Sequence, residues 1–357
     1  MKKILKIVTV ISILILIVIL CKFKEKSKNN IPNAIYCNTD TKLIQGTEYV
    51  NGQYTYIYKA EYGYSNISGP RLVNMNEDGW SVILTDKDST APVTSELCTY
   101  INNKPVVSMS YMFGFSKSKS IDLSSFNTSN IRNMNAMFIN AEVAEINVSN
   151  FDTSNVTKMY RMFYDSKIKE IKGIKNFNTS NVKDMDGIFA YSNVETLDLS
   201  NFNTQNVTNM NNMFTYSKVS VIDLSNFDTS KVTNMANMFR MANATTIKGL
   251  ETLNTSKVTS MSNMFAGTKL STLDLSNFDT SKVTNMNEMF TNNSTLKTIF
   301  VGNKFNTNKV TLSSYMFNNC TSLIGGSGTK YNINNPTDKT YAHIDSGMQN
   351  PGYFTAK

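Results

Sequence analysis

Apolar residues recur along most of the chain with a period of about 25 residues. In the unit 270–290 (LSTLDLSNFDTSKVTNMNEMF), Leu273 and Leu275 alternate around Asp274, which predicts a short strand with two inward side chains and one outward side chain. A second apolar stripe has offsets of 0, +3, +6 and +7 and consists of Val283, Met286, Met289 and Phe290. These offsets predict a short helix with one buried face.

Each unit ends on a phenylalanine, and the units align column by column. The phenylalanines are spaced by 25 to 27 residues and are Phe113, Phe138, Phe163, Phe189, Phe214, Phe239, Phe265, Phe290 and Phe317. Another column is threonine in all eight full units, always preceded by Asn or Asp. Short oxygen side chains of this kind form turns and cap helix starts. Because stacked repeats give each column one environment, the pattern predicts a solenoid.

Two units differ from the others in their strand segment. Residues 171–177 (IKGIKNF) and 247–253 (IKGLETL) replace the usual DLSNF pattern, are one residue longer, and lie 76 residues apart. The solenoid is therefore predicted to consist of duplicated three-repeat blocks. Gly173 and Gly249 would permit a bulge or a sharper bend at these two units.

The segments that flank the repeats predict end caps. Residues 31–105 are β-rich: Asn51-Gly52 favours a tight hairpin turn, and Trp80, Val82 and Leu84 alternate along a further strand. This segment would cover the first repeat of the solenoid at 106–323. Its tyrosines and Trp80 would instead stack on sugar rings if they were exposed. Residues 324–357 predict a C-terminal cap and tail with one or two strands.

Residues 1–30 have the pattern of a targeting segment. Three early lysines precede the apolar run 7–21, which is short for a spanning helix but suits a signal peptide. Cys21 stands where a bacterial lipoprotein carries its lipid, although Leu20 is not the small residue that lipidation favours. A signal peptide, a lipidated Cys21 and an uncleaved membrane anchor remain alternatives. Each of them places the rest of the chain outside the cytoplasm, at the cell surface or secreted.

The cysteines and charges restrict the remaining chemistry. Cys37 and Cys98 either pair in an oxidising compartment or are two separate thiols. The net charge is +8, but residues 1–30 hold seven lysines against Glu25 and leave +2 for the remainder. A body so close to neutral argues against a nucleic-acid partner. His343 is the single histidine, and no catalytic or metal-binding motif is present, which predicts neither an enzyme nor a cofactor.

The repeat resembles a known family. Units such as LDLSNFDTSKVTNMNEMF, over about 106–323, are similar to the BspA-like leucine-rich-repeat surface proteins, also described as the lipoprotein repeat family of mycoplasmas. The resemblance implies an α/β, leucine-rich-repeat-like solenoid of about eight strand–turn–short-helix units with a parallel sheet on one face. It also implies surface display and adhesion without catalysis.

The outward positions of the predicted strands form one candidate binding strip, which we term the strand-face column. Its members are Asp122, Asn147, Lys172, Asp198, Asp223, Lys248, Asp274 and Phe300. The column varies while its inward neighbours do not, either because it recognises a partner or because it is solvated. Mixed charge suits a protein or glycan on a host or neighbouring cell. A self-associating coat protein is the alternative function, and a carbohydrate-active enzyme with paired carboxylates is a third.

Overall fold

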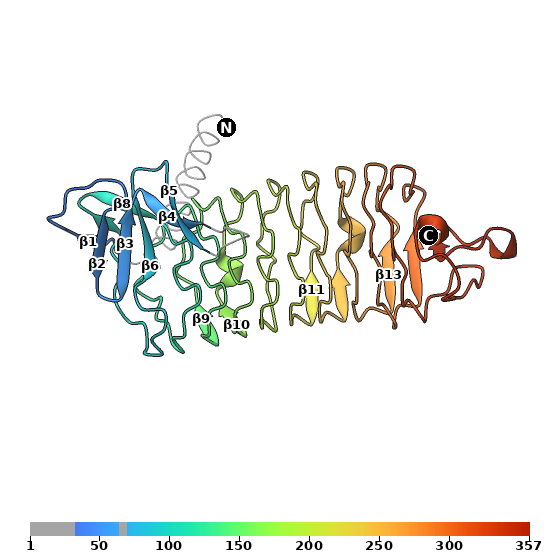
Figure 1. Ribbon diagram of the computed structural model, residues 1–357, viewed down its shortest axis with the longest axis horizontal. Coiled ribbons are helices and arrows are strands. Elements are labelled where there is room, and N and C mark those ends of the chain that lie inside the picture. Colours follow the sequence, from blue (N-terminus) through green and yellow to red (C-terminus); the bar gives the residue numbers. More distant parts are fainter. Residues whose placement is uncertain (1–32, 64–69) are drawn as a thin grey trace, which may run out of the picture.

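The repeats wind into a β-solenoid of about nine turns. The computed structural model describes residues 33–63 and 70–357, and the turns, here called rungs, stack along the long axis of the molecule (Figure 1). The predicted targeting segment 1–30, with Cys21, lies outside the described residues. Among the described residues, no helix is long and apolar enough to cross a membrane.

Short parallel strands line one side of the solenoid. They are β9 (Glu145–Asn147), β10 (Glu170–Lys172), β11 (Val221–Asp223), β12 (Thr246–Lys248), β13 (Thr272–Leu275) and β14 (Thr298–Val301). They pair in register two by two, β9 with β10, β11 with β12 and β13 with β14, as in the buried pair Leu273 and Ile299. The predicted parallel sheet and its inward leucine positions are therefore confirmed, as short paired segments.

The predicted short helices are wrong, and the α/β fold class with them. In each rung, two residues of the segment predicted to be helical have a positive φ, for example Ala136 at 51° and Asn140 at 53°, which no α-helix accommodates. The backbone N–H groups of Met134, Ala136 and Phe138 donate to carbonyls of the next rung at 2.8–2.9 Å. The apolar stripe therefore lies on successive turns whose hydrogen bonds run between rungs rather than along a helix.

Stacked apolar columns form the core. The predicted methionine and phenylalanine columns are buried, and the phenylalanines that end the units stack with ring centroids 5.4–6.1 Å apart. Identical rungs place identical rings above one another, so each ring contacts its copy in the next rung. One hydrophobic cluster extends from Tyr54 to Phe354.

The two longer units contain the expected bends. Gly173 and Gly249 have φ values of 86° and 79°, and each is followed by a 3₁₀ turn, η1 (Ile174–Asn176) or η2 (Leu250–Thr252). A Cβ atom on Gly173 would lie 2.4 Å from the Cα of Ser149, and one on Gly249 would lie 2.5 Å from the N of Ser225. Glycine thus allows these rungs to approach the preceding rung closely.

A β-rich cap covers the N-terminal end. Its six-stranded sheet has the order β1-β7-β8-β6-β3-β2. The strands are β1 (Tyr36–Cys37), β2 (Glu48–Asn51), β3 (Tyr54–Tyr58), β6 (Trp80–Leu84), β7 (Tyr100–Ile101) and β8 (Lys104–Ser108). The predicted hairpin is confirmed as β2–β3, although its two-residue turn is Gly52-Gln53. Tyr54 packs edge-on against Phe126 of the solenoid, which joins the cap and the solenoid into one core.

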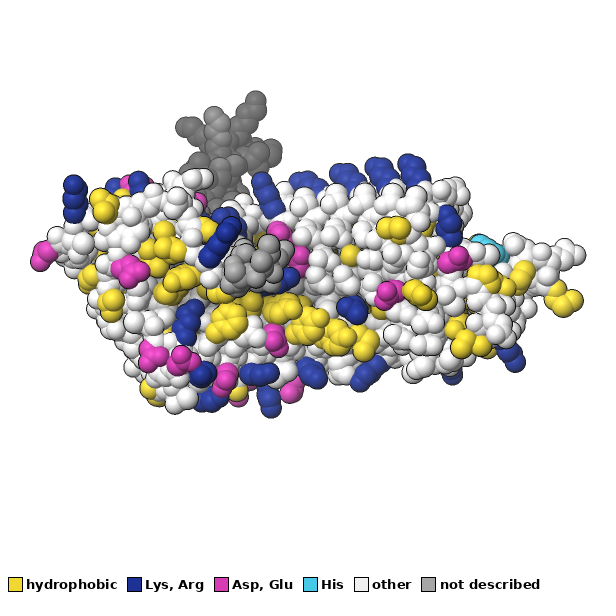
Figure 2. Space-filling model, in the orientation of Figure 1, with side chains coloured by type: hydrophobic (Ala, Val, Ile, Leu, Met, Phe, Trp, Pro, Cys, Tyr) yellow, Lys and Arg dark blue, Asp and Glu magenta, His cyan; other side chains and the backbone are white. Residues whose placement is uncertain are grey.

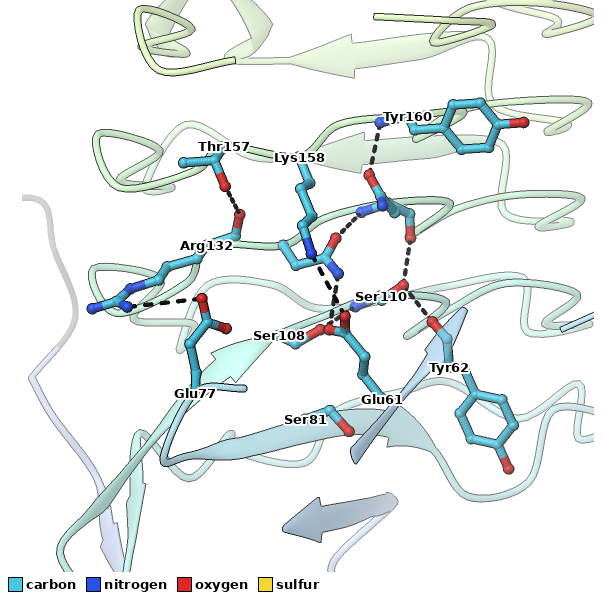
Figure 3. A network of polar contacts seen from close by, with 12 residues as sticks. Glu61, Tyr62, Glu77, Ser81, Ser108, Ser110, Arg132, Thr157, Lys158 and Tyr160 are labelled. Atoms are coloured by element: carbon cyan, nitrogen blue, oxygen red, sulfur yellow. Dashed lines mark hydrogen bonds and ion pairs between the residues drawn. The ribbon is translucent and has the colours of Figure 1, made fainter. Parts of the chain in front are cut away.

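A second hairpin, β4 (Ala60–Gly63) with β5 (Arg71–Asn74), fastens the cap to the first rungs (Figure 3). Glu61 is almost fully buried and accepts a 2.8 Å hydrogen bond from Asn133 Nδ2, and Lys158 lies 3.9 Å from its other oxygen. Ser110 Oγ donates to the carbonyl of Tyr62 at 2.7 Å. These bonds tie the hairpin to residues more than forty positions further along the chain.

The C-terminal end is closed by residues that follow the last rung. Strand β15 (Phe354–Ala356) pairs in parallel with β14, and the 3₁₀ turns η3 (Lys339–Tyr341) and η4 (Gly347–Gln349) precede it. Asp345 is buried and accepts hydrogen bonds from the N–H groups of Ser327, Thr329 and Gly347 at 2.8–3.0 Å. The terminal strand thereby covers the open edge that β14 would otherwise present.

Candidate partner-binding face

The strand-face column lies along one side of the solenoid, as its sequence positions predicted. Strand registers pair Asn147 with Lys172, Asp223 with Lys248, and Asp274 with Phe300. Asp122 and Asp198 line hollows together with Asn147 and Asp223, respectively. The fold therefore brings residues from eight separate units to one continuous surface.

The carboxylates of this column also hold the backbone of their own rung. In Asp122, Asp198, Asp223 and Asp274, Oδ1 accepts the N–H of the serine two residues later at 2.8–3.1 Å. Hydrogen bonds from Ser200 and Ser225 keep the pKa values of Asp198 and Asp223 below the usual range for aspartate. These aspartates therefore have a structural role in addition to any role in recognition.

Lysines balance the negative charges of the column. Lys172 lies 3.6 Å from Glu145, and Lys248 lies 3.9 Å from Asp223. Lys357 forms an ion pair with Asp274, and its ammonium group lies 5.8 Å from the centre of the Phe300 ring. The face is thus a mixture of charged, hydroxyl and amide groups, in which lysines pair with part of the carboxylates.

Two hollows on this face repeat with the 76-residue period of the blocks. The first, about 230 Å³, is lined by Ile121, Asp122, Leu123, Ser124, Asn147, Ser149 and Asn150. The second, about 430 Å³, is lined by Leu197, Asp198, Leu199, Ser200, Asp223, Ser225 and Asn226. Each residue of the second hollow lies 76 positions after its counterpart in the first.

The glycine rungs bound the hollows on their C-terminal side. Gly173 brings its backbone against Ser149, and Gly249 brings its backbone against Ser225, so the rung step that follows each hollow is tightly packed. Within each hollow, Asn150 or Asn226 donates to backbone carbonyls of the preceding rung at 3.0–3.5 Å and fixes the two walls. Asn147 belonged to the predicted site, but Ser149, Asn150, Ser225 and Asn226 were absent from it, although the repeated SNF segment contained them.

The N-terminal cap contains neither an exposed tryptophan nor free thiols. Trp80 is fully buried and its Nε1 donates to the carbonyl of Ile101 at 3.2 Å, so it offers no surface for stacking on a sugar. Cys37 and Cys98 form a disulfide with Cα atoms 5.9 Å apart, and Asn51 Nδ2 donates to the Cys98 sulfur at 2.9 Å. Among the described residues, Cys320 is the one free cysteine, and burial raises the pKa of its thiol to about 12.

The arrangement is suited to binding through hydrogen bonds. Carboxylate, hydroxyl and amide groups lie together at the hollows, on a backbone that neighbouring rungs hold in place. In the part of the chain that the structure describes, no group of three or more His, Cys, Asp or Glu side chains could hold a metal ion. His343 lies in the C-terminal cap, where its Nδ1 is 3.0 Å from the carbonyl oxygen of Ile344.

Comparisons with known proteins reproduce the block structure. No curated protein and no solved structure matched the chain. A family model described as "Mycoplasma protein of unknown function, DUF285" matches three successive segments, 91–172, 166–248 and 240–350. The three segments together span most of the chain, and their starts lie 75 and 74 residues apart, close to the 76-residue block. The chain therefore belongs to the family of Mycoplasma proteins of unknown function, DUF285.

Proposed function

We propose that this protein is a cell-surface binding protein that mediates adhesion to host or neighbouring cells through the strand face of its solenoid, without catalysis. The observation that carries the proposal is the pair of equivalent hollows at Ile121–Asn150 and Leu197–Asn226. A repeated surface can contact a partner at two places with the same chemistry, which raises affinity through multivalency.

The chemistry of the hollows favours a polar, uncharged partner surface. Asp198, Ser200 and Asn226 provide acceptors and donors within one hollow, and nearby lysines reduce its net charge. A protein or glycan with hydroxyl and amide groups fits this surface better than an anion. The resemblance to BspA-like leucine-rich-repeat surface proteins supports the same function. The pattern of residues 1–30, including Cys21, supports attachment to the membrane.

The proposal is tested by filling both hollows. The full chain, solubilised in detergent, is titrated on epithelial cells and on immobilised extracellular-matrix proteins. Ser149→Trp with Ser225→Trp places a large side chain in each hollow. The control, Ser154→Trp with Ser180→Trp, places the same side chain at another turn, where serine is held by an Asx hydrogen bond of the same kind.

We expect saturable binding that the hollow variant loses and the control variant keeps. Equal binding by both variants would exclude the hollows as the contact site. Absence of binding, together with concentration-dependent association in sedimentation, would favour the coat-protein function instead. Circular dichroism of each variant verifies that the solenoid remains folded.

A further inference from the structure

Four lysines from successive rungs form a row along an edge that the strand face does not include. Lys231, Lys257, Lys282 and Lys309 occupy the column immediately before the buried valines, and all four are exposed. Figure 2 shows a row of Lys and Arg side chains along the upper edge of the C-terminal half of the solenoid. At one rung per step, the row spans roughly 14 Å.

The same column has a different role in the first half of the solenoid. There it is asparagine, and the amides of Asn155, Asn181 and Asn206 each donate to a serine carbonyl of the preceding rung at 2.8–2.9 Å. Lys231 is the first lysine of the column, and its ammonium group still bonds to the preceding rung, where it donates to Asn206 Oδ1 at 2.7 Å. The asparagines thus contribute hydrogen bonds that hold adjacent rungs together.

The remaining three lysines of the row contribute no such bonds. Within the described residues, Lys257, Lys282 and Lys309 make no side-chain hydrogen bond and no ion pair. Like charges stacked one rung apart repel each other, so the row does not stabilise the ladder. Its positive charge is therefore available to a ligand.

Two further lysines increase the positive charge of this edge. The positive charges of Lys304 and Lys282 both stabilise the ionised carboxylate of Asp279. Lys339 Nζ donates to the carbonyl of Val310, the residue after Lys309. Two carboxylates lie within the electrostatic influence of the row, Asp228 near Lys231 and Asp279 near Lys282. They accept hydrogen bonds from the backbone N–H groups of Ser230 and Ser281. With Asp338 beside Lys339, six lysines against three aspartates leave three net positive charges.

The side chains beside the row indicate the class of ligand. Thr233, Thr259 and Thr284 lie two positions after the lysines, and each hydroxyl donates to the preceding rung and keeps its lone pairs available. Serines or an asparagine lie on the other side. Neither flanking column contains an aromatic or apolar side chain that would stack on bases or insert into a lipid layer.

We propose that the lysine row is a second binding site, specific for a linear acidic polysaccharide. The sulfate or carboxylate groups of such a polymer would lie along the ammonium groups, and its hydroxyl groups would donate to the threonines. One sugar ring advances along a chain by a length comparable to one rung, so charges on successive sugars can meet successive lysines. This site is independent of the hollows on the strand face.

The test compares dextran sulfate with neutral dextran, which share a backbone and differ in charge. The full chain in detergent is titrated with each polymer, with a single-stranded DNA oligomer and with phosphatidylglycerol vesicles. The row variant carries Lys231→Gln, Lys257→Gln, Lys282→Gln and Lys309→Gln, and a matched arginine variant keeps the charge. The control carries Lys218→Gln and Lys269→Gln, two exposed lysines at the turn before the strand.

We expect salt-sensitive binding of dextran sulfate and none of neutral dextran. The row variant should lose roughly tenfold in affinity, and the arginine and control variants should bind nearly as the unaltered chain does. The hollow variant Ser149→Trp with Ser225→Trp should also keep this binding. Undiminished binding by the row variant, or no binding of dextran sulfate, would overturn the site. Tighter binding of DNA or vesicles would overturn the assignment to a polysaccharide.

Discussion

Each of seven successive rungs contains a buried threonine whose hydroxyl group links it to the next rung. Thr229 Oγ1 donates to the carbonyl of Asn254 at 3.0 Å and accepts the N–H of the same residue at 2.8 Å. Thr128, Thr153, Thr179, Thr255 and Thr280 form the same double link, and Thr204 donates to Asp228. A hydroxyl group on a short side chain can serve both groups at once, which explains why this column is uniform.

Replacement of Thr229 by valine should lower the free energy of unfolding by about 2 kcal/mol, because a buried N–H and a buried carbonyl lose their partner. Thr229→Ser is the control. It keeps the hydroxyl group and should cost about 1 kcal/mol for the lost methyl group. Urea unfolding of both variants measures the difference. Equal losses would show that packing, and not the double hydrogen bond, determines the residue.

At the scale of the element, the turn segments show where pattern analysis is ambiguous. Offsets of 0, +3, +6 and +7 place side chains on one side of a helix, but they do the same on two successive turns with a positive φ at every fourth residue. A left-handed residue other than glycine costs about 1–2 kcal/mol. Bonds from Met134, Ala136 and Phe138 to the next rung offset this cost, and an isolated helix could not form them.

The glycine rungs are a second element with a measurable consequence. Gly249→Ala should destabilise the protein by about 2–3 kcal/mol, since a positive φ is combined with a Cβ atom 2.5 Å from the backbone N of Ser225. Gly328→Ala is the matched control. Its φ is also positive, but nothing lies within 4 Å of its Cβ position, so it should cost about 1 kcal/mol. Thermal unfolding measures both, and equal effects would contradict the close approach of the rungs.

At the scale of the whole molecule, stability depends on neighbouring rungs and on the two caps. Each rung contacts the next along its phenylalanine, threonine and strand columns, so a rung at either end would leave one side exposed. Tyr54 covers Phe126 at the N-terminal end, and Phe354 covers Phe317 at the C-terminal end. The disulfide between Cys37 and Cys98 closes a loop of the N-terminal cap.

Reduction of this disulfide should destabilise the cap more than the solenoid. Loop-closure entropy for a separation of 61 residues corresponds to about 4 kcal/mol. Trp80 is the single tryptophan and lies in the cap, so its fluorescence reports cap unfolding, while circular dichroism reports mainly the solenoid. We expect reduction to shift the fluorescence transition in urea more than the dichroism transition. Identical shifts would show that cap and solenoid unfold as one unit.

Cys320 requires a control in that experiment because it is also a cysteine. It is a buried free thiol whose Sγ donates to the carbonyl of Phe290 at 2.9 Å, and a reductant leaves it unchanged because a thiol is already reduced. A Cys37→Ala, Cys98→Ala variant should reproduce the effect of the reductant. Addition of reductant to this variant should then cause no further shift.

The sequence by itself determined the repeat, its inward columns, the three-repeat blocks and the strand face. These features depend on one environment recurring in every rung, so agreement between copies reveals them without coordinates. The asparagine column that becomes lysine at Lys231 was visible in the same way, but the overall charge of the body concealed it. Net charge averages over all surfaces, whereas a solenoid places one column on one edge.

Only the tertiary structure decided which hydrogen-bond partners the backbone between the columns has. Side-chain periodicity records which residues face inward, and both a helix and a series of inter-rung turns satisfy it. The choice depends on N–H and carbonyl partners in the adjacent rung, at positions such as Ala136 and Tyr160 that are far apart in the sequence. The hollows have the same origin, because residues of two adjacent rungs line each of them.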